Sequence, residues 1–157
     1  MKNIIKLLIS IVICQVAGFI GSIFTTPNIP TWYAMIKKPA FAPPNWIFAP
    51  VWTTLFLLMG IALYLVWRKG LNNLPVRTAF TIFILQLIVN ILWSMMFFYF
   101  MFPLGGFVVI IALWLLILLT IIHFINISRV AGILLIPYLL WVSFASVLNF
   151  MLWRLNL

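Results

Sequence analysis

Residues 32–56 read WYAMIKKPAFAPPNWIFAPVWTTLF, a stretch that differs from the apolar remainder of the chain in its density of aromatic rings and prolines. Proline fixes φ, lacks an N–H donor and disfavours helical geometry in the residue before it. The prolines within residues 39–44 therefore predict a stiff loop that cannot continue a helix, with Lys37 and Lys38 on its water-facing side. Tryptophan combines a large apolar ring with one N–H donor, which suits a membrane interface or a ligand pocket. We expect a rigid aromatic lid over a bundle of helices.

The composition is that of a membrane protein. Of the 157 residues, 68% are hydrophobic and 6% are charged, whereas a soluble domain is about half apolar and about a quarter charged. The chain contains nine Lys and Arg residues and no Asp or Glu, which excludes catalysis by paired carboxylates, carboxylate metal sites and carboxylate proton relays. The basic residues lie singly or in pairs between apolar runs, so we expect them to set topology and to contact anionic lipid headgroups rather than nucleic acid.

The hydropathy pattern divides the chain into five long apolar runs. A helix needs about 20 apolar residues to cross the hydrocarbon core of a bilayer. A signal peptide is the alternative for the first run, but the run continues past Ile23 without a cleavage pattern of small residues, so we expect a retained helix. The chain is therefore expected to form a single domain, residues 1–157, that is an all-α bundle of five transmembrane helices. The expected helices cover residues 4–25, 46–67, 78–102, 104–126 and 132–155, and the aromatic, proline-rich loop covers residues 27–45.

The distribution of basic residues predicts the orientation in the membrane. Loops on the cytoplasmic side carry an excess of Lys and Arg. With five spans, six basic residues fall on one side and three on the other, so we expect a cytoplasmic N-terminus, an outside C-terminus and an aromatic loop that faces away from the cytoplasm. The larger group consists of Lys2, Lys6, Arg68, Lys69, Arg77 and Arg129, and the smaller group of Lys37, Lys38 and Arg154.

Small residues recur four apart along the first helix, as Ala17 with Gly21 and as Gly18 with Ser22. Such pairs let two helix backbones approach closely in lipid. Packing within the bundle and packing between subunits are both compatible with this pattern, and we favour a homodimer.

Amides within the apolar runs need partners, because burying an unpaired amide in hydrocarbon costs several kcal/mol. Gln15, Asn90 and Asn149 are such amides, in the first, third and fifth expected helices. They are expected to point inward, toward a neighbouring helix or a ligand. For Asn90 a hydrogen bond between helices and a contact with a ligand are both open.

Three stripes of rings and amides lie at helical spacing, and each stripe alone is typical of core packing. Together they combine aromatic walls, a few N–H or amide donors and one small residue that leaves room. That combination is expected of a pocket for a flat, largely apolar ligand. The stripes are Asn90, Trp93 and Phe97; Trp141, Ala145 and Asn149; and Trp52 and Phe56.

The sequence gives little support for a metal site, a haem site or a conventional catalytic site. His123 is the only histidine and Cys14 the only cysteine. A lone histidine could be an axial haem ligand, but a histidine at the membrane interface that bonds headgroups or water is the better interpretation, and we expect no metal site. No catalytic triad, phosphate-binding loop, dinucleotide-binding motif or CxxC motif is present.

Three motifs, in order along almost the whole chain, give it a specific likeness. The sequence resembles the translocator protein family, whose members are also called tryptophan-rich sensory proteins or peripheral-type benzodiazepine receptors, and is similar to its bacterial members. The first motif consists of Trp32, Tyr33, Lys38, Pro39, Pro43, Pro44, Trp46, Phe48, Val51 and Trp52; the second of Asn90, Trp93, Phe97 and Phe98; and the third of Pro137, Tyr138, Trp141, Phe144, Ala145, Leu148, Asn149, Trp153, Arg154 and Asn156.

The resemblance implies a five-helix bundle, often homodimeric, in a cell membrane that is expected to be bacterial. It implies binding of porphyrins such as protoporphyrin IX, with no cofactor required, in a pocket roofed by the loop between the first two helices. Some bacterial members are reported to degrade porphyrin in light through tryptophans, and Trp52 and Trp141 match those positions. The ligand-binding residues implied by the motifs are Tyr33, Trp52, Asn90, Trp93, Trp141 and Ala145.

Three functions therefore stay open at the level of the sequence. The first is a porphyrin-binding receptor that acts in tetrapyrrole sensing or regulation. The second is an enzyme that degrades porphyrin with light and oxygen, and the third is a transporter of porphyrin or sterol. Animal members carry a sterol motif whose tyrosine is replaced here by Phe150, so strict sterol matching fails. Leu58, Tyr64 and Arg68 match a general sterol pattern, which by itself is weak evidence.

Overall fold

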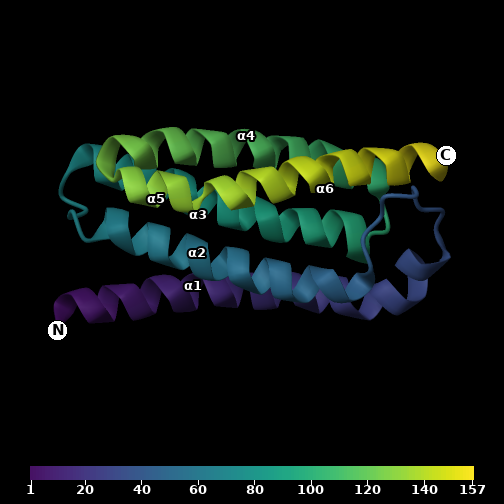
Figure 1. The fold of residues 1–157 in the computed structure, drawn as a ribbon, viewed down its shortest axis with the longest axis horizontal. Helices are drawn as coiled ribbons and strands as arrows, with labels where there is room; N and C mark the ends of the chain where they lie inside the picture. Colours follow the sequence, from purple (N-terminus) through teal and green to yellow (C-terminus); the bar gives the residue numbers. More distant parts are fainter.

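The computed structural model describes residues 1–157 and contains only helices and loops. Five helical stretches are long and apolar enough to cross a membrane, in agreement with the predicted all-α bundle of five transmembrane helices. The fifth stretch consists of two helices, so six α-helices are labelled in Figure 1. They are α1 (Lys2–Thr25), α2 (Phe48–Trp67), α3 (Leu74–Ser94), α4 (Pro103–Ile127), α5 (Arg129–Leu134) and α6 (Ile136–Leu155).

The helices run side by side along the long axis of the molecule, and the two chain termini lie at opposite ends (Figure 1). Helix α1 packs against α2 and α3, and α4 packs against α3 and α6. The loop between α1 and α2 lies at the end that carries the C-terminus (Figure 1). We refer to this end as the loop end and to the other as the N-terminal end.

The first helix does not stop at Pro27, as the sequence suggested, but stays helical to Tyr33. A tight turn, Thr26–Asn28, and a π-turn, Ile29–Tyr33, follow α1 directly. Proline removes one backbone donor, and wide or tight turns with side-chain bonds can absorb that loss. Accordingly, Asn28 Nδ2 donates to the carbonyl of Phe24 at 2.8 Å and Thr31 Oγ1 to that of Pro27 at 3.1 Å. The irregular part of the predicted loop 27–45 therefore begins after the π-turn.

Two other predicted helices have different limits. The third begins at Leu74 rather than at residue 78, because Pro75 occupies the first turn, where a missing N–H costs nothing. It continues past α3 through a π-turn, Met95–Tyr99, and ends before residue 102. The fifth begins earlier than residue 132, with Ser128 as its N-cap: the backbone N–H of Ala131 donates to Ser128 Oγ at 3.3 Å. It is interrupted at Leu135, two residues before Pro137.

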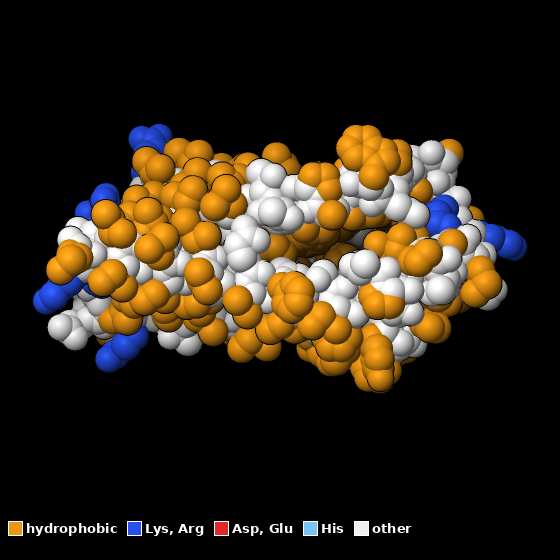
Figure 2. Space-filling view, turned by 90° about the horizontal axis from the view of Figure 1, so that it is seen from below, with side chains coloured by type: hydrophobic (Ala, Val, Ile, Leu, Met, Phe, Trp, Pro, Cys, Tyr) orange, Lys and Arg blue, Asp and Glu red, His pale blue; other side chains and the backbone are white.

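The basic residues separate to the two ends of the bundle, and the face shown in Figure 2 carries Lys and Arg only there. The ends of α1 and α2 meet at the N-terminal end, where Lys6 Nζ lies 5.8 Å from the centre of the Trp67 ring. Between the ends the surface is apolar: Phe19, Leu115 and Leu140 are 67%, 57% and 64% exposed. These side chains would face lipid in a membrane.

The interior differs between the two ends. Toward the N-terminal end it is filled by tightly packed side chains such as Phe83 and Phe124, whose rings stack 5.6 Å apart. There α1 and α2 approach so closely that a Cβ on Gly60 would lie 2.7 Å from the Cα of Ile11. Toward the loop end the interior is aromatic and contains cavities. The small residues of α1 border this space, because Gly18 faces the Phe56 ring and Gly21 faces Ser94. Their stripe therefore packs within the bundle, and the homodimer stays a prediction.

Candidate functional site

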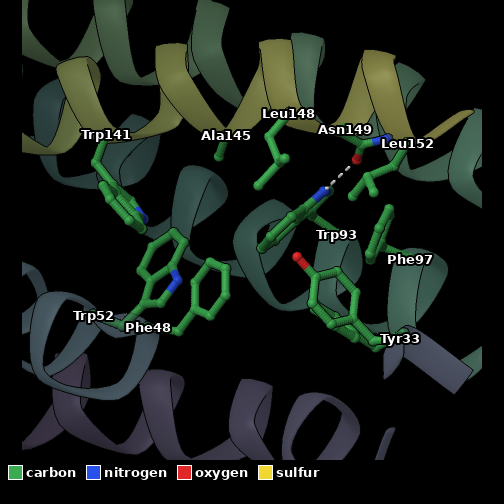
Figure 3. Close-up of a pocket in the computed structure, with 11 residues that line it drawn as sticks. Tyr33, Phe48, Trp52, Trp93, Phe97, Trp141, Ala145, Leu148, Asn149 and Leu152 are labelled. Atoms are coloured by element: carbon green, nitrogen blue, oxygen red, sulfur yellow. Dashed lines mark hydrogen bonds between the residues drawn. The ribbon is translucent and has the colours of Figure 1, made fainter. Parts of the chain in front are cut away.

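A small aromatic cavity lies inside the loop end of the bundle (Figure 3). Its volume is about 30 Å³, and ten of its eleven lining residues are hydrophobic. Residues of α6 form one wall, and rings of α2, of α3 with its π-turn and of the segment after α1 form the others (Figure 3). The lining residues are Tyr33, Phe48, Trp52, Trp93, Phe97, Phe98, Trp141, Ala145, Leu148, Asn149 and Leu152.

Most of the rings around this cavity contact one another edge to face or tilted, and Trp93 stacks on Phe97. Trp52 lies 6.1 Å from Trp93, and Phe48 lies 6.2 Å from Trp141, measured between ring centres. Such arrangements match the negative face of one ring to the positive edge of the next. Phe48 is linked to Trp93 through Tyr33 and Phe98, so the tryptophans of α2, α3 and α6 belong to one continuous aromatic wall.

Two polar atoms in the cavity wall are buried without a partner. They are Trp141 Nε1 and Tyr33 Oη, and they are the only such side-chain atoms in the chain. A buried donor left without a hydrogen bond costs about 1–3 kcal/mol. In Figure 3 both atoms point toward the space between α2, α3 and α6. A ligand that offers an acceptor there would satisfy these groups.

Two other donors of the predicted site, those of Trp93 and Asn90, are already used, whereas Trp52 Nε1 makes no hydrogen bond. Trp93 Nε1 donates to Asn149 Oδ1 at 3.0 Å, and Asn149 Nδ2 donates to the carbonyl of Pro103 at 2.8 Å. Asn90 Nδ2 donates to Tyr138 Oη at 2.6 Å. The interhelical bond that the sequence left open for Asn90 is therefore present, and it links α3 to α6.

A larger cleft of about 580 Å³ lies on the other side of the aromatic wall, between α1, the start of α2 and the end of α3. Figure 2 shows a hollow in this face of the molecule, in the half nearer the loop end. Phe48, Trp52, Trp93 and Phe98 line both the cleft and the aromatic cavity, so they separate the two spaces. The polar lining of the cleft consists of Gln15, Ser22, Thr25, Thr26, Asn45, Thr53, Asn90 and Ser94.

The segment after α1 covers the cavity from the loop end. Tyr33 is 2% exposed, and its ring lies 6.3 Å from Phe48 and 5.9 Å from Phe98. Lys38 Nζ lies 4.7 Å from the centre of the Tyr33 ring. Tyr33 and Phe98 belong to the two π-turns of the chain, and π-turns are frequent at functional sites.

The loop is also tied to the end of α6. Asn156 Oδ1 accepts from the backbone N–H of Lys37 at 2.9 Å, and Asn156 Nδ2 donates to the carbonyl of the same residue at 2.9 Å. One side-chain amide thus pairs with both backbone groups of a residue 119 positions away. We refer to this pair of bonds as the Asn156 latch.

We expect Asn156→Ala to loosen the loop without unfolding the bundle. Loss of the two bonds should speed tryptic cleavage after Lys37 by about tenfold, the equivalent of about 1.4 kcal/mol in local opening. The measurement is the rate at which the corresponding fragment forms in detergent. Asn72→Ala is the control, because Asn72 is exposed at the other end and makes no side-chain hydrogen bond. Equal cleavage rates in the two variants would show that the latch does not hold the loop.

The structure brings five of the six predicted ligand-binding residues to the aromatic cavity. Asn90 is the exception, because it lines the cleft on the other side of the wall. Gln86 was not among the predicted site residues, and it is fully buried one helical turn before Asn90. The sequence signal that could have identified it is an amide four residues before Asn90, on the same helical face. The five residues at the cavity are Tyr33, Trp52, Trp93, Trp141 and Ala145.

The only histidine lies away from this site. His123 Nδ1 lies 2.9 Å from the carbonyl oxygen of Leu119, one turn earlier in its own helix. Its ring nitrogen is therefore partnered within α4.

Comparison with known proteins identifies the family. The sequence profile of the TspO/MBR family matches residues 10–154. This chain belongs to the TspO/MBR family. The family is one of integral membrane proteins, so the five apolar helices are transmembrane helices. The resemblance that the three motifs indicated is thereby confirmed.

Relatives within the TspO/MBR family cover almost the full length of the chain. The tryptophan-rich protein TspO of Archaeoglobus fulgidus is 47% identical over 98% of this chain and 99% of its own length. That of Chlorobaculum tepidum is 44% identical over 99% of this chain and 98% of its own length. The translocator protein of Homo sapiens is 35% identical over 88% of this chain and 82% of its own length. The regions matched by the two TspO proteins therefore span the residues of the loop, the aromatic cavity and the cleft.

Proposed function

We propose that this TspO/MBR protein binds protoporphyrin IX, or a similarly flat and largely apolar molecule, and acts as a membrane receptor in tetrapyrrole sensing or regulation. The observation that carries the proposal is the pair of unpartnered groups, Trp141 Nε1 and Tyr33 Oη, in a cavity otherwise walled by rings. Rings stack on a flat ligand, and a few polar groups fix its orientation. The carbonyl or carboxyl oxygens at the edge of a porphyrin supply the acceptors that these two groups lack.

The size of the two spaces indicates how such a ligand would enter. The aromatic cavity, at about 30 Å³, holds little more than a water molecule. The cleft, at about 580 Å³, falls within the usual range of roughly 300–1,000 Å³ for ligand pockets. A porphyrin that reaches Trp141 must therefore move the rings between the two spaces. Phe48 and Trp52 at the start of α2 are the part of that wall nearest to the loop between α1 and α2.

The direct test is titration of the detergent-purified protein with protoporphyrin IX while tryptophan fluorescence is recorded. Because Trp52, Trp93 and Trp141 lie at the cavity, saturable quenching is expected. Quenching no stronger than that of free tryptophan at equal concentration would refute the proposal.

Porphyrin degradation in light is a second candidate, because Trp52 and Trp141 both line the cavity, where a bound porphyrin would contact them. Illumination of the complex in oxygen separates it from binding alone. Loss of the porphyrin absorbance with formation of one defined product supports an enzyme. Unspecific bleaching at the rate seen with free tryptophan supports a binding protein.

We also propose that the protein lies in a bacterial cell membrane, as its resemblance to bacterial members implies. Its N-terminus is placed in the cytoplasm by the six-to-three distribution of its basic residues. Asn72 is exposed in the turn between α2 and α3, at the end with six. A cysteine at position 72 is expected to react with a membrane-impermeant maleimide only after the cells are opened. The native Cys14 is fully buried and serves as the internal background. Labelling at position 72 in intact cells would show that the N-terminus lies outside, the opposite of the proposed orientation.

A further inference from the structure

A row of four side chains crosses the middle of the bundle beside the cleft. Asn90 Nδ2 donates to Tyr138 Oη at 2.6 Å, and Tyr138 Oη donates to Gln86 Oε1 at 2.8 Å. Gln86 Nε2 in turn lies 3.8 Å from Met59 Sδ, which it uses as an acceptor. We call these four residues the polar row. Gln86 and Met59 are fully buried, Tyr138 is 1% exposed and Asn90 is 4% exposed.

The direction of the hydrogen bonds in the polar row is fixed by Met59, the residue at its buried end. A methionine sulfur can only accept, so the amide nitrogen of Gln86 faces Met59 and its carbonyl oxygen faces Tyr138. A tyrosine hydroxyl has a single proton, which is then committed to Gln86 Oε1. Its oxygen must accept the bond from the Asn90 amide, which sets the NH₂ group of Asn90 toward Tyr138.

The open end of the polar row is the carbonyl oxygen of Asn90. No protein donor bonds this atom. It is not fully enclosed either, because the only fully enclosed side-chain atoms without a partner are Trp141 Nε1 and Tyr33 Oη. Since Asn90 lines the cleft, its Oδ1 is accessible there. Ser94 Oγ, one turn further along the same face of α3, also lines the cleft without a hydrogen-bond partner.

We propose that Tyr138 and Gln86 determine ligand specificity by holding the Asn90 amide so that the cleft offers a hydrogen-bond acceptor. The site then has two unlike ends. The aromatic cavity offers the donor Trp141 Nε1 together with Tyr33 Oη, whereas the cleft offers the acceptor Asn90 Oδ1 beside the hydroxyl of Ser94. The class of ligand selected is a flat apolar molecule with an acceptor at one edge and an N–H or O–H donor at the other. Tyr138 and Gln86 act through Asn90 and are positioning residues. The part that concerns ligands rests on the proposed function.

The direction of the row can be tested without any ligand. Protein labelled with ¹⁵N at asparagine and glutamine side chains is compared with its Tyr138→Phe variant by NMR, and signals are assigned by their loss in Asn90→Asp and Gln86→Glu. In the proposed direction the Asn90 NH₂ loses its acceptor and its signal shifts, while the Gln86 NH₂ keeps Met59 and its signal stays. A shift of the Gln86 signal with an unchanged Asn90 signal would show the opposite direction and overturn the inference.

The effect on specificity is tested with two porphyrins, of which one carries hydroxyl donors and the other carries methoxy groups in their place. They are haematoporphyrin dimethyl ester, which carries hydroxyl groups at its edge, and the same compound with those hydroxyls methylated. The native protein is expected to bind the hydroxyl compound about tenfold more tightly, because the methylated one leaves Asn90 Oδ1 unpaired. In Tyr138→Phe the amide can turn, and the preference should fall below about twofold.

Gln86→Leu gives a result that structural damage cannot imitate. Without Gln86 Oε1, the Tyr138 proton has only Asn90 Oδ1 as an acceptor, so the Asn90 amide turns and presents its NH₂ to the cleft. The methylated porphyrin should then bind severalfold more tightly than it binds to the native protein. Ser146→Ala is the control, because it removes another buried hydroxyl of α6, one that bonds only the carbonyl of Val142.

The outcomes separate this inference from the proposed function. If neither porphyrin binds the native protein, the proposed function fails, while the NMR comparison still decides the direction of the polar row. If both bind equally well to the native protein, or if Ser146→Ala changes the preference as much as Tyr138→Phe does, the positioning role of the polar row is refuted.

Discussion

Replacing Ala145 with phenylalanine is expected to weaken protoporphyrin IX binding by about thirtyfold or more, equivalent to about 2 kcal/mol. Ala145 lies in the α6 wall of the aromatic cavity, between Trp141 and Leu148 (Figure 3). It is 8% exposed, and the whole cavity measures about 30 Å³, which is less than a phenyl ring needs. The new ring would occupy the space in front of Trp141 Nε1. It would thereby keep an acceptor atom of the ligand from reaching this donor. The measurement is quenching of tryptophan fluorescence by protoporphyrin IX.

Circular dichroism distinguishes a blocked site from a misfolded protein. Ala112→Phe is the matched control, since Ala112 is exposed on α4 and lines neither the cavity nor the cleft. It should bind like the native protein. If Ala145→Phe is helical and binds protoporphyrin IX as tightly as the control, the ligand lies elsewhere and the aromatic cavity is not its site.

The number and type of helices could be predicted because the membrane leaves few alternatives. Buried backbone groups in lipid must be paired within a helix, so the length of each apolar run decides the span. The limits of the helices were less predictable where proline occurs. Pro27 and Pro137 remove one bond each, but the chain continues by means of a tight turn followed by a π-turn in one case and a short break in the other. Which of these solutions is used depends on neighbouring side chains such as Asn28, whose amide bonds Phe24.

The composition of the site could be read from residue spacing, but not its division into two spaces. Helical periodicity places Asn90 and Trp93 on one face of α3. It does not tell on which side of the Trp52 ring each will lie, because that depends on how α1, α2 and α6 are rotated about their axes. The same holds for the state of the donors. That Trp93 Nε1 is paired with Asn149 while Trp141 Nε1 is free follows from contacts between helices, which a single sequence does not contain.

Gly60→Ala is expected to destabilise the bundle, although alanine is the better helix former. A Cβ at Gly60 would lie 2.7 Å from the Cα of Ile11 and 3.2 Å from its backbone nitrogen, so the backbones of α1 and α2 would have to separate. Overpacking of this kind costs about 1–3 kcal/mol, and close helix contacts in lipid depend on small residues. We expect a clear fall in the midpoint of thermal unfolding in detergent, followed by circular dichroism.

Gly21→Ala is the matched control for this prediction. It is the same substitution in a neighbouring helix, but its Cβ would lie 3.4 Å from Ser94 Oγ, an ordinary contact at the border of the cleft. Its unfolding midpoint should equal or exceed that of the native protein, because the helix gains propensity without a clash. The contrast bears on the site, since Gly60 and Ile11 lie one helical turn from Phe56 and Gln15, which line the cleft. If Gly60→Ala is as stable as Gly21→Ala, α1 and α2 are not in close contact at Gly60, next to the cleft.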